Sequence, residues 1–267
     1  MTSASVHVWR FALDLGPRAV AGLWGLLDGG ERSRAFAFAD ERVRARFVAA
    51  RGHTRLALAA LTGTAPARLS FSDVGAGKPR LAEPDQGLEF NIAHCGPVMV
   101  LAAADVAVGV DVERRGRVPA AELLNLAKAA FAPAEIAGLS ALAPRLRADA
   151  ILELWVRREA VLKGLGLGLT APAGLVDLSG ASGALGPSGE SGAVRIGDGA
   201  QATVWALRDL DLGADHLGAV AAQAKAIRVI RHEPASLRAP FIRGPRDGSY
   251  PGRQGSGSTA TILSSLA

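Results

Sequence analysis

The sequence predicts a mixed α+β (α/β) fold made of two similar halves in one chain. Alternating apolar residues near the N-terminus and again near residue 108 are typical of strands. Each of these segments is followed by helical stretches rich in Ala, Leu and Arg, and then by short strands. With 49 % hydrophobic residues among 267, the chain can bury a large core. We therefore expect an N-terminal half over residues 1–105, a C-terminal half over 106–231 and a tail over 232–267.

The elements of the N-terminal half begin with a strand at residues 6–13, where large side chains recur at every second position. Residues 18–62 have a helical pattern with a break at Gly29 and Gly30. The segments after it predict a strand, a Gly/Pro-rich loop and a second strand: 67–74, 75–87 and 88–94.

The C-terminal half begins inside a long apolar stretch. Residues 98–105 and 106–113 are joined too tightly for a helix between them, so we expect a hairpin. Three helices should follow: 120–131, 133–142 and 145–164. Glycines at 164, 166 and 168 end the last helix. Four short strands are expected after it: 174–178, 193–196, 202–210 and 216–223.

The composition indicates in which compartment the protein works and what kind of partner it binds. The formal charge is +5 and the pI is about 10.1, which favours nucleic acid, phosphate-rich cofactors or acidic proteins, although a genome that prefers Arg and Ala codons has the same effect. The single cysteine, Cys95, fits a reducing compartment. No signal peptide is visible and the apolar run 98–104 is too short to span a bilayer, so we expect a cytoplasmic protein without a membrane partner. The tail is rich in Pro, Gly, Ser and Arg, which indicates flexibility.

Two stretches place carboxylates where they share a face. In "GVDVERR", Asp111 and Glu113 point to one side of a strand, and Gly109 on that side leaves room for a ligand. In "LWVRREAVLKG", Trp155, Glu159 and Lys163 are spaced four apart and form a stripe along a helix. Each stretch alone has a plain structural explanation, as solvated charge or as a surface ion pair. Together they suit a hard cation, Mg²⁺ or Mn²⁺, bound with substrate phosphates.

Cationic side chains elsewhere are candidates for the remaining phosphate oxygens. Lys78 and Arg80 lie in the Gly/Pro loop, and His94 ends a predicted strand. A predicted helix carries several arginines, most of which we expect to be solvated: Arg42, Arg44, Arg46, Arg51 and Arg55.

Four motifs in order, "GKP", "FNIAH", "GVDVE" and "WVRREAVLK", resemble those of the 4′-phosphopantetheinyl transferases of the surfactin-synthetase-activating type. The resemblance covers residues 5–225 and implies that family's fold, a pseudo-dimer of two α/β halves with the site at their junction. It also implies the reaction: Mg²⁺-dependent transfer of the phosphopantetheine arm of coenzyme A to a serine of an acyl or peptidyl carrier protein, releasing 3′,5′-ADP. Fatty acid, polyketide and peptide synthases all remain open as sources of the carrier.

The resemblance also implies residue roles. The metal-binding acids are Asp111, Glu113 and Glu159, and the catalytic pair is Glu159 with Lys163. Residues expected to hold coenzyme A are Arg46, Arg51, Lys78, His94, Asp111 and Lys163. Whether Glu159 is the base or only a metal ligand stays open. We expect a monomer whose basic surface meets acidic carriers.

Two departures from the family pattern stand out. Ala93 replaces a serine beside the histidine, leaving a backbone N–H or Cys95 to supply that contact, and Arg158 replaces a lysine before Glu159. Two other functions are alternatives: a metal-dependent nuclease or phosphodiesterase, and a non-catalytic basic binding module that uses the Arg-rich helix and the tail. A nuclease does not account for the Gly-Lys-Pro loop or the Trp-containing helix, and a nucleic-acid partner is not expected.

Overall fold

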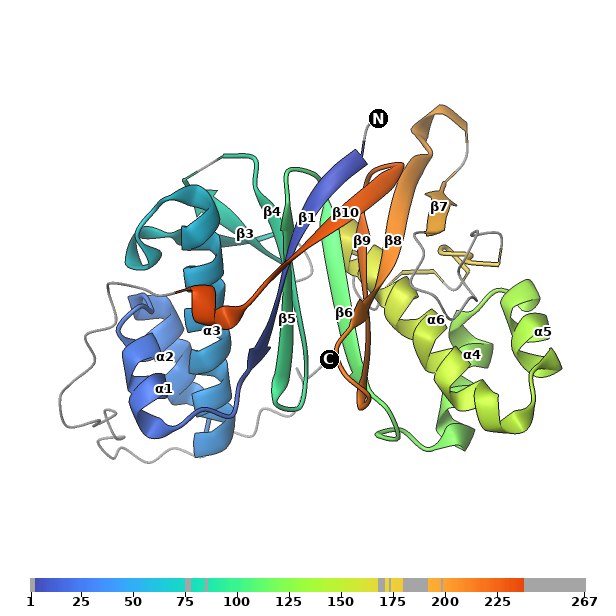
Figure 1. Ribbon diagram of the computed structural model, residues 1–267, viewed down its shortest axis with the longest axis horizontal. Coiled ribbons are helices and arrows are strands. Elements are labelled where there is room, and N and C mark those ends of the chain that lie inside the picture. The colour runs from blue at the N-terminus through green and yellow to red at the C-terminus, as the bar shows by residue number, and fades with distance from the viewer. Residues whose placement is uncertain are drawn as a thin grey trace.

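Two four-stranded sheets face each other at the centre of the molecule, with helices on both outer sides (Figure 1). The computed structural model describes residues 3–74, 78–84, 86–167, 171–172, 174–179, 192–197 and 199–237. In that part of the chain, no helix is both long enough and apolar enough to cross a membrane. The predicted mixed α/β class is confirmed.

The first sheet has the strand order β10-β1-β5-β4. Its strands are β1 (Ser3–Ala12), β4 (Glu89–Cys95), β5 (Val98–Ala104) and β10 (Ala226–His232). Three helices and a two-stranded ribbon separate β1 from β4: α1 (Pro17–Trp24), α2 (Gly29–Ala37), α3 (Glu41–Thr62), β2 (Ser70–Val74) and β3 (Lys78–Glu83). Asp40 caps the start of α3 by accepting from the Val43 N–H, and Gly63, with φ of +70°, ends it.

The second sheet has the order β6-β9-β8-β7 and is antiparallel throughout. Its strands are β6 (Val108–Arg114), β7 (Gly192–Ile196), β8 (Thr203–Asp211) and β9 (His216–Ala222). Its helices are α4 (Ala120–Ala130), α5 (Pro133–Ala141) and α6 (Pro144–Leu165). In both sheets the first strand precedes the helices, a 22-residue helix is the longest of those helices, and a hairpin pairs antiparallel with that first strand. The division at residue 105 stays a prediction.

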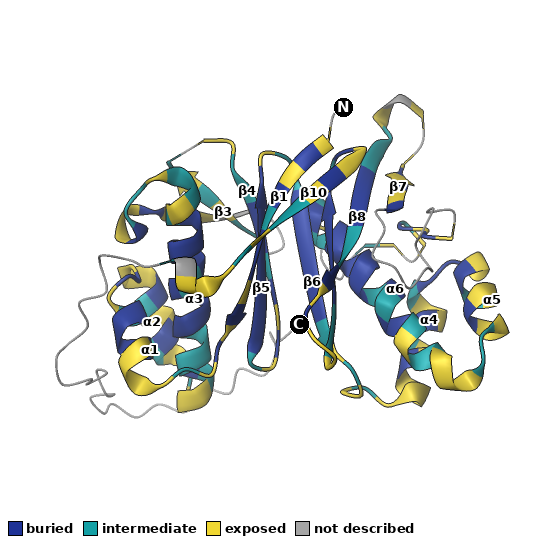
Figure 2. Cartoon of the chain, in the orientation of Figure 1, coloured by how far each residue is buried: buried dark blue, intermediate teal, exposed yellow. Residues whose placement is uncertain are grey.

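The core lies in three layers (Figure 2). The middle layer joins the two sheets through small side chains, mostly Val and Ala, which allow the sheets to pack closely. The outer layers pack α1–α3 on the first sheet and α4–α6 on the second. The second sheet and α6 thereby fix where the predicted acids lie.

Several sequence predictions were wrong in detail. The segments 98–105 and 106–113 do not form a hairpin: β5 pairs with β1 and β4, whereas β6 pairs with β9 in the other sheet. The predicted loop 75–87 contains β3, paired with β2. The described residues 174–178 form turns and bends rather than a strand.

The last strand, β10, was missed, and it lies parallel to β1 in the first sheet. Its segment, "AIRVIRH", has two isoleucines and one valine among basic residues, and this alternation is too weak to predict a strand. The tail expected from residue 232 begins with the end of β10 and a short helical turn at Pro234–Ser236. The rest of the predicted tail, from residue 238, lies outside the described residues.

Candidate active site

The strand β6 presents two chemically different faces. Val108, Val110 and Val112 lie in the apolar layer between the sheets. The alternating positions, Gly109 and Asp111 among them, therefore point to the opposite face, where α6 packs against the strand. This alternation brings a carboxylate under a helix that carries Glu159 and Lys163.

Two glycines let α6 approach β6 closely. A Cβ on Gly109 would lie 2.0 Å from the Ala160 carbonyl oxygen and 2.3 Å from the Gly164 nitrogen. A Cβ on Gly164 would lie 2.4 Å from the Trp205 ring. The expectation that Gly109 leaves room for a ligand was therefore wrong, because the helix backbone occupies that space.

Asp111 is the most deeply buried of the predicted acids, with 4 % of its surface exposed. Its Oδ1 accepts a hydrogen bond from Lys163 Nζ at 2.6 Å. Its Oδ2 is buried and has no hydrogen-bond partner among the residues that the structure describes. Burial raises the pKa of Asp111, and the Lys163 ammonium opposes that rise. The carboxylate thus keeps an unused oxygen aimed into the protein.

Glu159 lies on α6 and is 8 % exposed. Burial, followed by the negative charge of Asp111, raises the pKa of Glu159 to about 7, while Lys163 and Arg158 oppose the change. The two carboxyl groups are therefore close enough to repel each other. A carboxyl group with this pKa is well placed to exchange a proton near neutral pH.

Glu113 is held where the two sheets meet. Cys95, at the end of β4, lies with its Sγ 3.5 Å from Glu113 Oε2. Arg117 Nη1 donates to the same oxygen at 3.3 Å and lies 3.8 Å from Cys95 Sγ. Cys95, on the first sheet, thus contacts a predicted metal ligand of the second sheet.

The three predicted metal ligands are not gathered into one cage. Among the described residues, no three His, Cys, Asp or Glu side chains are grouped closely enough to hold a metal ion. Asp111 turns to Lys163 and Glu113 to Arg117, because each carboxylate pairs with the nearest cation. The donor set nevertheless fits a hard cation, since it is made of carboxylates and includes the unpartnered Oδ2 of Asp111. The assignment of these three residues stays a prediction.

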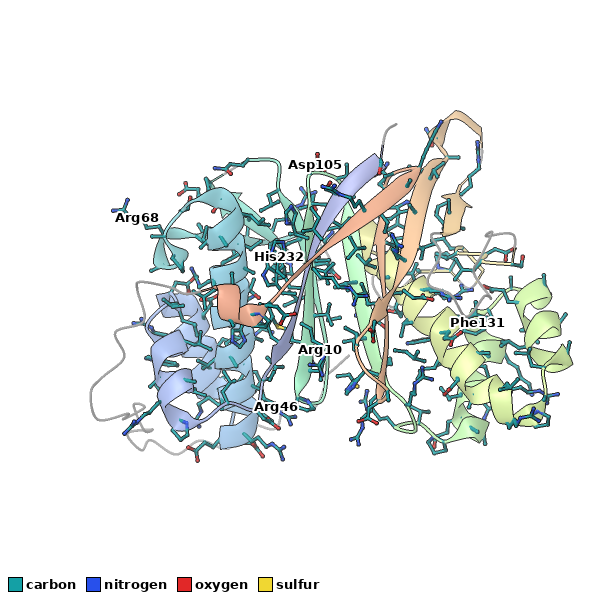
Figure 3. All side chains as sticks on the ribbon, in the orientation of Figure 1. Arg10, Arg46, Arg68, Asp105, Phe131 and His232 are labelled. Carbon is teal, nitrogen blue, oxygen red and sulfur yellow. The ribbon has the colours of Figure 1, made fainter. Side chains whose placement is uncertain are left out.

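Basic side chains of β4 and α3, His94 and Arg46, lie near the same place. Partial loss of water around its ring, then the positive charges of Lys163, Arg46 and Arg117, lowers the pKa of His94. The His94 side chain is exposed at the end of β4. Arg46, labelled in Figure 3 near the lower ends of α3 and β5, donates to both Asp14 oxygens at 2.6 and 2.9 Å. Lys163, Arg46 and Arg117 therefore lie close enough to His94 for their charges to act on its ring, and we call these four side chains the positive region.

Two predicted coenzyme-binding residues have other contacts. Arg51 lies 3.3 Å from Glu31 and over the rings of Phe47 and Phe71, so the structure does not bring it to the acids. Lys78 Nζ faces the protein interior, where it donates to the Val108 and Gly164 carbonyl oxygens at 3.3 and 3.4 Å. Burial lowers the pKa of Lys78, and Glu89, at 3.6 Å, opposes that change. The roles proposed for both residues toward coenzyme A stay predictions.

The two departures from the family pattern have structural explanations. Ala93 is buried in the apolar layer between the sheets, where a methyl group packs well. Arg158 is buried and donates to Glu135 Oε2 at 2.7 Å, with its guanidinium over the Phe131 ring. Glu135 also accepts from the Ala132 and Leu178 N–H groups. Arg158 therefore anchors α6 to neighbouring segments rather than facing the acids.

Sequence reasoning missed two residues of this region, Asn91 and Arg117. Asn91 is buried and its Oδ1 accepts from the Val110 N–H of β6 at 3.0 Å. A polar residue in the apolar strand 88–94 was a usable signal, because buried amides need partners. Arg117 carried no such signal, since it comes shortly after Arg114 and Arg115 and has no distinguishing spacing.

Comparisons with known proteins agree with the motifs. Residues 107–221 match the model of the 4′-phosphopantetheinyl transferase superfamily. The 4′-phosphopantetheinyl transferase HetI of a Nostoc species is 31 % identical over 172 residues, which is 63 % of this chain and 72 % of that protein. A 4′-phosphopantetheinyl transferase of Bacillus subtilis is 34 % identical over 119 residues, 44 % of this chain and 50 % of the relative. A phosphopantetheinyl transferase of a Thraustochytrium species is 32 % identical over 152 residues, covering 52 % and 51 %.

The matched region contains β6 and α6, the two elements that carry the acids and Lys163. The chain belongs to the 4′-phosphopantetheinyl transferase superfamily and is a transferase.

Proposed function

We propose that this enzyme transfers the 4′-phosphopantetheine arm of coenzyme A to a serine hydroxyl of an acyl or peptidyl carrier protein, releasing 3′,5′-ADP. The observation that carries the proposal is the cluster where β6 meets α6. Two coupled buried carboxylates lie beside Lys163, and cations of both halves surround them. A pyrophosphate with a divalent cation has the charges that such a cluster complements.

A divalent cation, Mg²⁺ or Mn²⁺, fits the carboxylates. Asp111, Glu113 and Glu159 would hold it, and the unpartnered Oδ2 of Asp111 supports this assignment. When bound, the cation supplies charge neutralisation for the pyrophosphate and for the leaving nucleotide.

Lys163 is the side chain best placed to bind a phosphate oxygen from the protein side. Its side chain is 29 % exposed while the ammonium bonds Asp111, so the side chain is accessible to a ligand. His94 and Arg46 extend the positive region into the N-terminal half, where the nucleotide end of coenzyme A would lie. Arg46 must share its guanidinium with Asp14, so its contribution depends on that ion pair.

Glu159 is the candidate proton acceptor for the serine hydroxyl. Its pKa of about 7 gives a substantial carboxylate fraction near neutral pH and a useful driving force for proton transfer. A carboxylate that also holds the cation is a weaker base, and the two roles compete. Replacing Glu159 with Gln preserves the shape of the side chain and removes both the base and the charged metal ligand.

The carrier is the second substrate. The formal charge of +5 favours an acidic surface around the modified serine, as this family's carriers have. A monomer in the cytoplasm is the state we expect for this reaction.

The test is a transfer assay on several apo carriers, from fatty acid, polyketide and peptide synthases, with coenzyme A and Mg²⁺. Intact-mass measurement should show that at least one carrier gains one phosphopantetheine, while 3′,5′-ADP appears in equal amount. Chelation of the metal, or Asp111→Asn, should stop both changes. No gain on any carrier, or Mg²⁺-dependent cleavage of nucleic acid instead, would contradict the proposal.

A further inference from the structure

The strand β6 lies at the edge of its sheet. Among the described residues, β9 is its one hydrogen-bonded neighbouring strand. Alternate N–H and C=O groups of an edge strand point away from that neighbour and need other partners when they are buried. The backbone N–H and C=O groups of the odd-numbered residues point toward β9, since the Ala107 carbonyl oxygen accepts from the Gln223 N–H. The even-numbered backbone groups therefore lie on the free edge.

Two side chains from the N-terminal half bind that edge. Asn91 Oδ1, on β4, accepts from the Val110 N–H at 3.0 Å. Lys78 Nζ, on β3, donates to the Val108 carbonyl oxygen at 3.3 Å. Both side chains are largely buried: Asn91 is 6 % exposed and the side chain of Lys78 is 13 % exposed. They satisfy an N–H and a C=O that a further strand would otherwise pair.

Lys78 binds the helix as well as the strand. At the end of α6, the Gly166 N–H donates to the Leu162 and Lys163 carbonyls. The Gly164 carbonyl is among the last four of the helix, which have no partner within it. It accepts from Lys78 Nζ at 3.4 Å, at the negative end of the helix dipole. One ammonium thus bonds β6 and α6 beside the close contact of Gly109 with Gly164.

We infer that Lys78 and Asn91 are positioning residues that hold β6 against α6. Their bonds fix the strand that carries Asp111 and the helix turn that carries Lys163, and so set the contact between these two side chains. The catalytic part of this inference rests on the proposed function, whereas the structural part does not. It gives Lys78 a role distinct from direct contact with coenzyme A.

The first test compares Lys78→Met with Lys78→Arg in the full chain. Hydrogen exchange of the β6 amides and of the last turn of α6 should become about tenfold faster in Lys78→Met, because charge-assisted hydrogen bonds are lost. Amides in α3 should not change. Lys78→Arg should restore most of the protection, since guanidinium also donates to two carbonyls. Lys128→Met, which removes an exposed lysine of α4, is the matched control and should change nothing.

The same variants separate positioning from binding in the transfer assay. Lys78→Met should lower kcat about tenfold or more and change the KM for coenzyme A by less than about threefold, because misplaced groups slow the chemical step. A direct contact with coenzyme A predicts the opposite division, a raised KM with kcat retained.

Asn91 supplies an independent variant if Lys78→Met does not fold. Asn91→Ala leaves the Val110 N–H without an acceptor and should speed exchange at that amide, whereas Asn91→Asp keeps an acceptor oxygen and should protect it. Unchanged exchange in β6 and α6 for Lys78→Met and Asn91→Ala would overturn the inference. If the unmodified enzyme transfers nothing, the proposed function fails, and the exchange data still decide the positioning role.

Discussion

Asp111 and Lys163 form a pair in which each side chain depends on the other. Lys163→Met should lower the free energy of unfolding by about 2 kcal/mol, because a buried carboxylate loses its cation. The value lies below that of a fully buried pair, since Lys163 is 29 % exposed. Asp111→Asn combined with Lys163→Met should recover most of this loss in a denaturation double-mutant cycle. Strictly additive effects would show that the pair is not coupled.

His53 predicts an acid-sensitive contribution to stability. Its ring stacks on Phe11 with centroids 4.4 Å apart, and its Nδ1 is buried with no hydrogen-bond partner in the described part of the chain. Burial lowers the pKa of His53 from 6.5 to about 4. The unfolded chain therefore binds this proton at higher pH than the folded protein does. The stability contributed by the neutral ring is complete above pH 6.5 and is lost as the pH falls toward 4.

Between pH 6.5 and 4, protonation of His53 should lower the free energy of unfolding by about 3 kcal/mol. His53→Phe keeps the stacking and removes the proton, so its unfolding free energy should fall less between pH 6.5 and 4. Urea denaturation at several pH values measures the difference. Equal pH dependence in the two proteins would contradict the assignment.

At the scale of elements, the contact between β6 and α6 depends on glycine. Gly109→Ala places a Cβ against the Ala160 carbonyl and the Gly164 nitrogen, and backbone atoms cannot yield as a side chain does. We expect a loss of about 3 kcal/mol or more and no transfer activity. Gly138→Ala in α5 is the control, because open space surrounds that position and helix propensity favours alanine by up to about 1 kcal/mol. A stable, active Gly109→Ala would refute the close contact.

The anchor of α6 gives a second prediction at this scale. Arg158→Lys restores the residue usual in the family, yet it should cost about 1–2 kcal/mol here, because an ammonium cannot reproduce the planar contact with Phe131 and Glu135. Thermal unfolding gives the cost. Transfer should stay within about threefold of the parent enzyme, since Arg158 does not face the acids. An unchanged or higher unfolding temperature for Arg158→Lys would show that Lys suits this pocket at least as well as Arg.

At the scale of the whole molecule, the net charge of the enzyme should set how fast it associates with a carrier protein. With a formal charge of +5, the enzyme should attract an acidic partner over a distance that salt shortens. We expect kcat/KM for an acidic carrier to fall about tenfold between low and high ionic strength, with kcat nearly constant. A kcat/KM that does not respond to salt would exclude electrostatic steering.

The sequence was most informative where periodicity was strong. The helices 120–131, 133–142 and 145–164 and the strands at 202–210 and 216–223 agree with α4, α5, α6, β8 and β9 within a residue or two. The alternation of β6 also placed Asp111 and Glu113 correctly on one strand. Pairing was harder, because local pattern says nothing about which sheet a strand joins. β5 and β6 are adjacent in sequence yet belong to different sheets.

The site could be predicted only in part for a similar reason. Residue type and spacing pointed to Asp111, Glu159 and Lys163, whose contacts lie within two adjoining elements. The partners of Lys78 and Arg51 depend on tertiary packing, and no local pattern specifies them. Gly109 shows the same limit: its small size was evident, but a helix backbone rather than a ligand fills the space.

The most direct measurement is anomalous diffraction from crystals of the protein grown with coenzyme A and Mn²⁺. A single manganese peak in contact with carboxylate oxygens of Asp111, Glu113 and Glu159, with the pyrophosphate beside Lys163, is the result we predict. Manganese bound elsewhere, or a pyrophosphate distant from the meeting of β6 and α6, would contradict the proposed site.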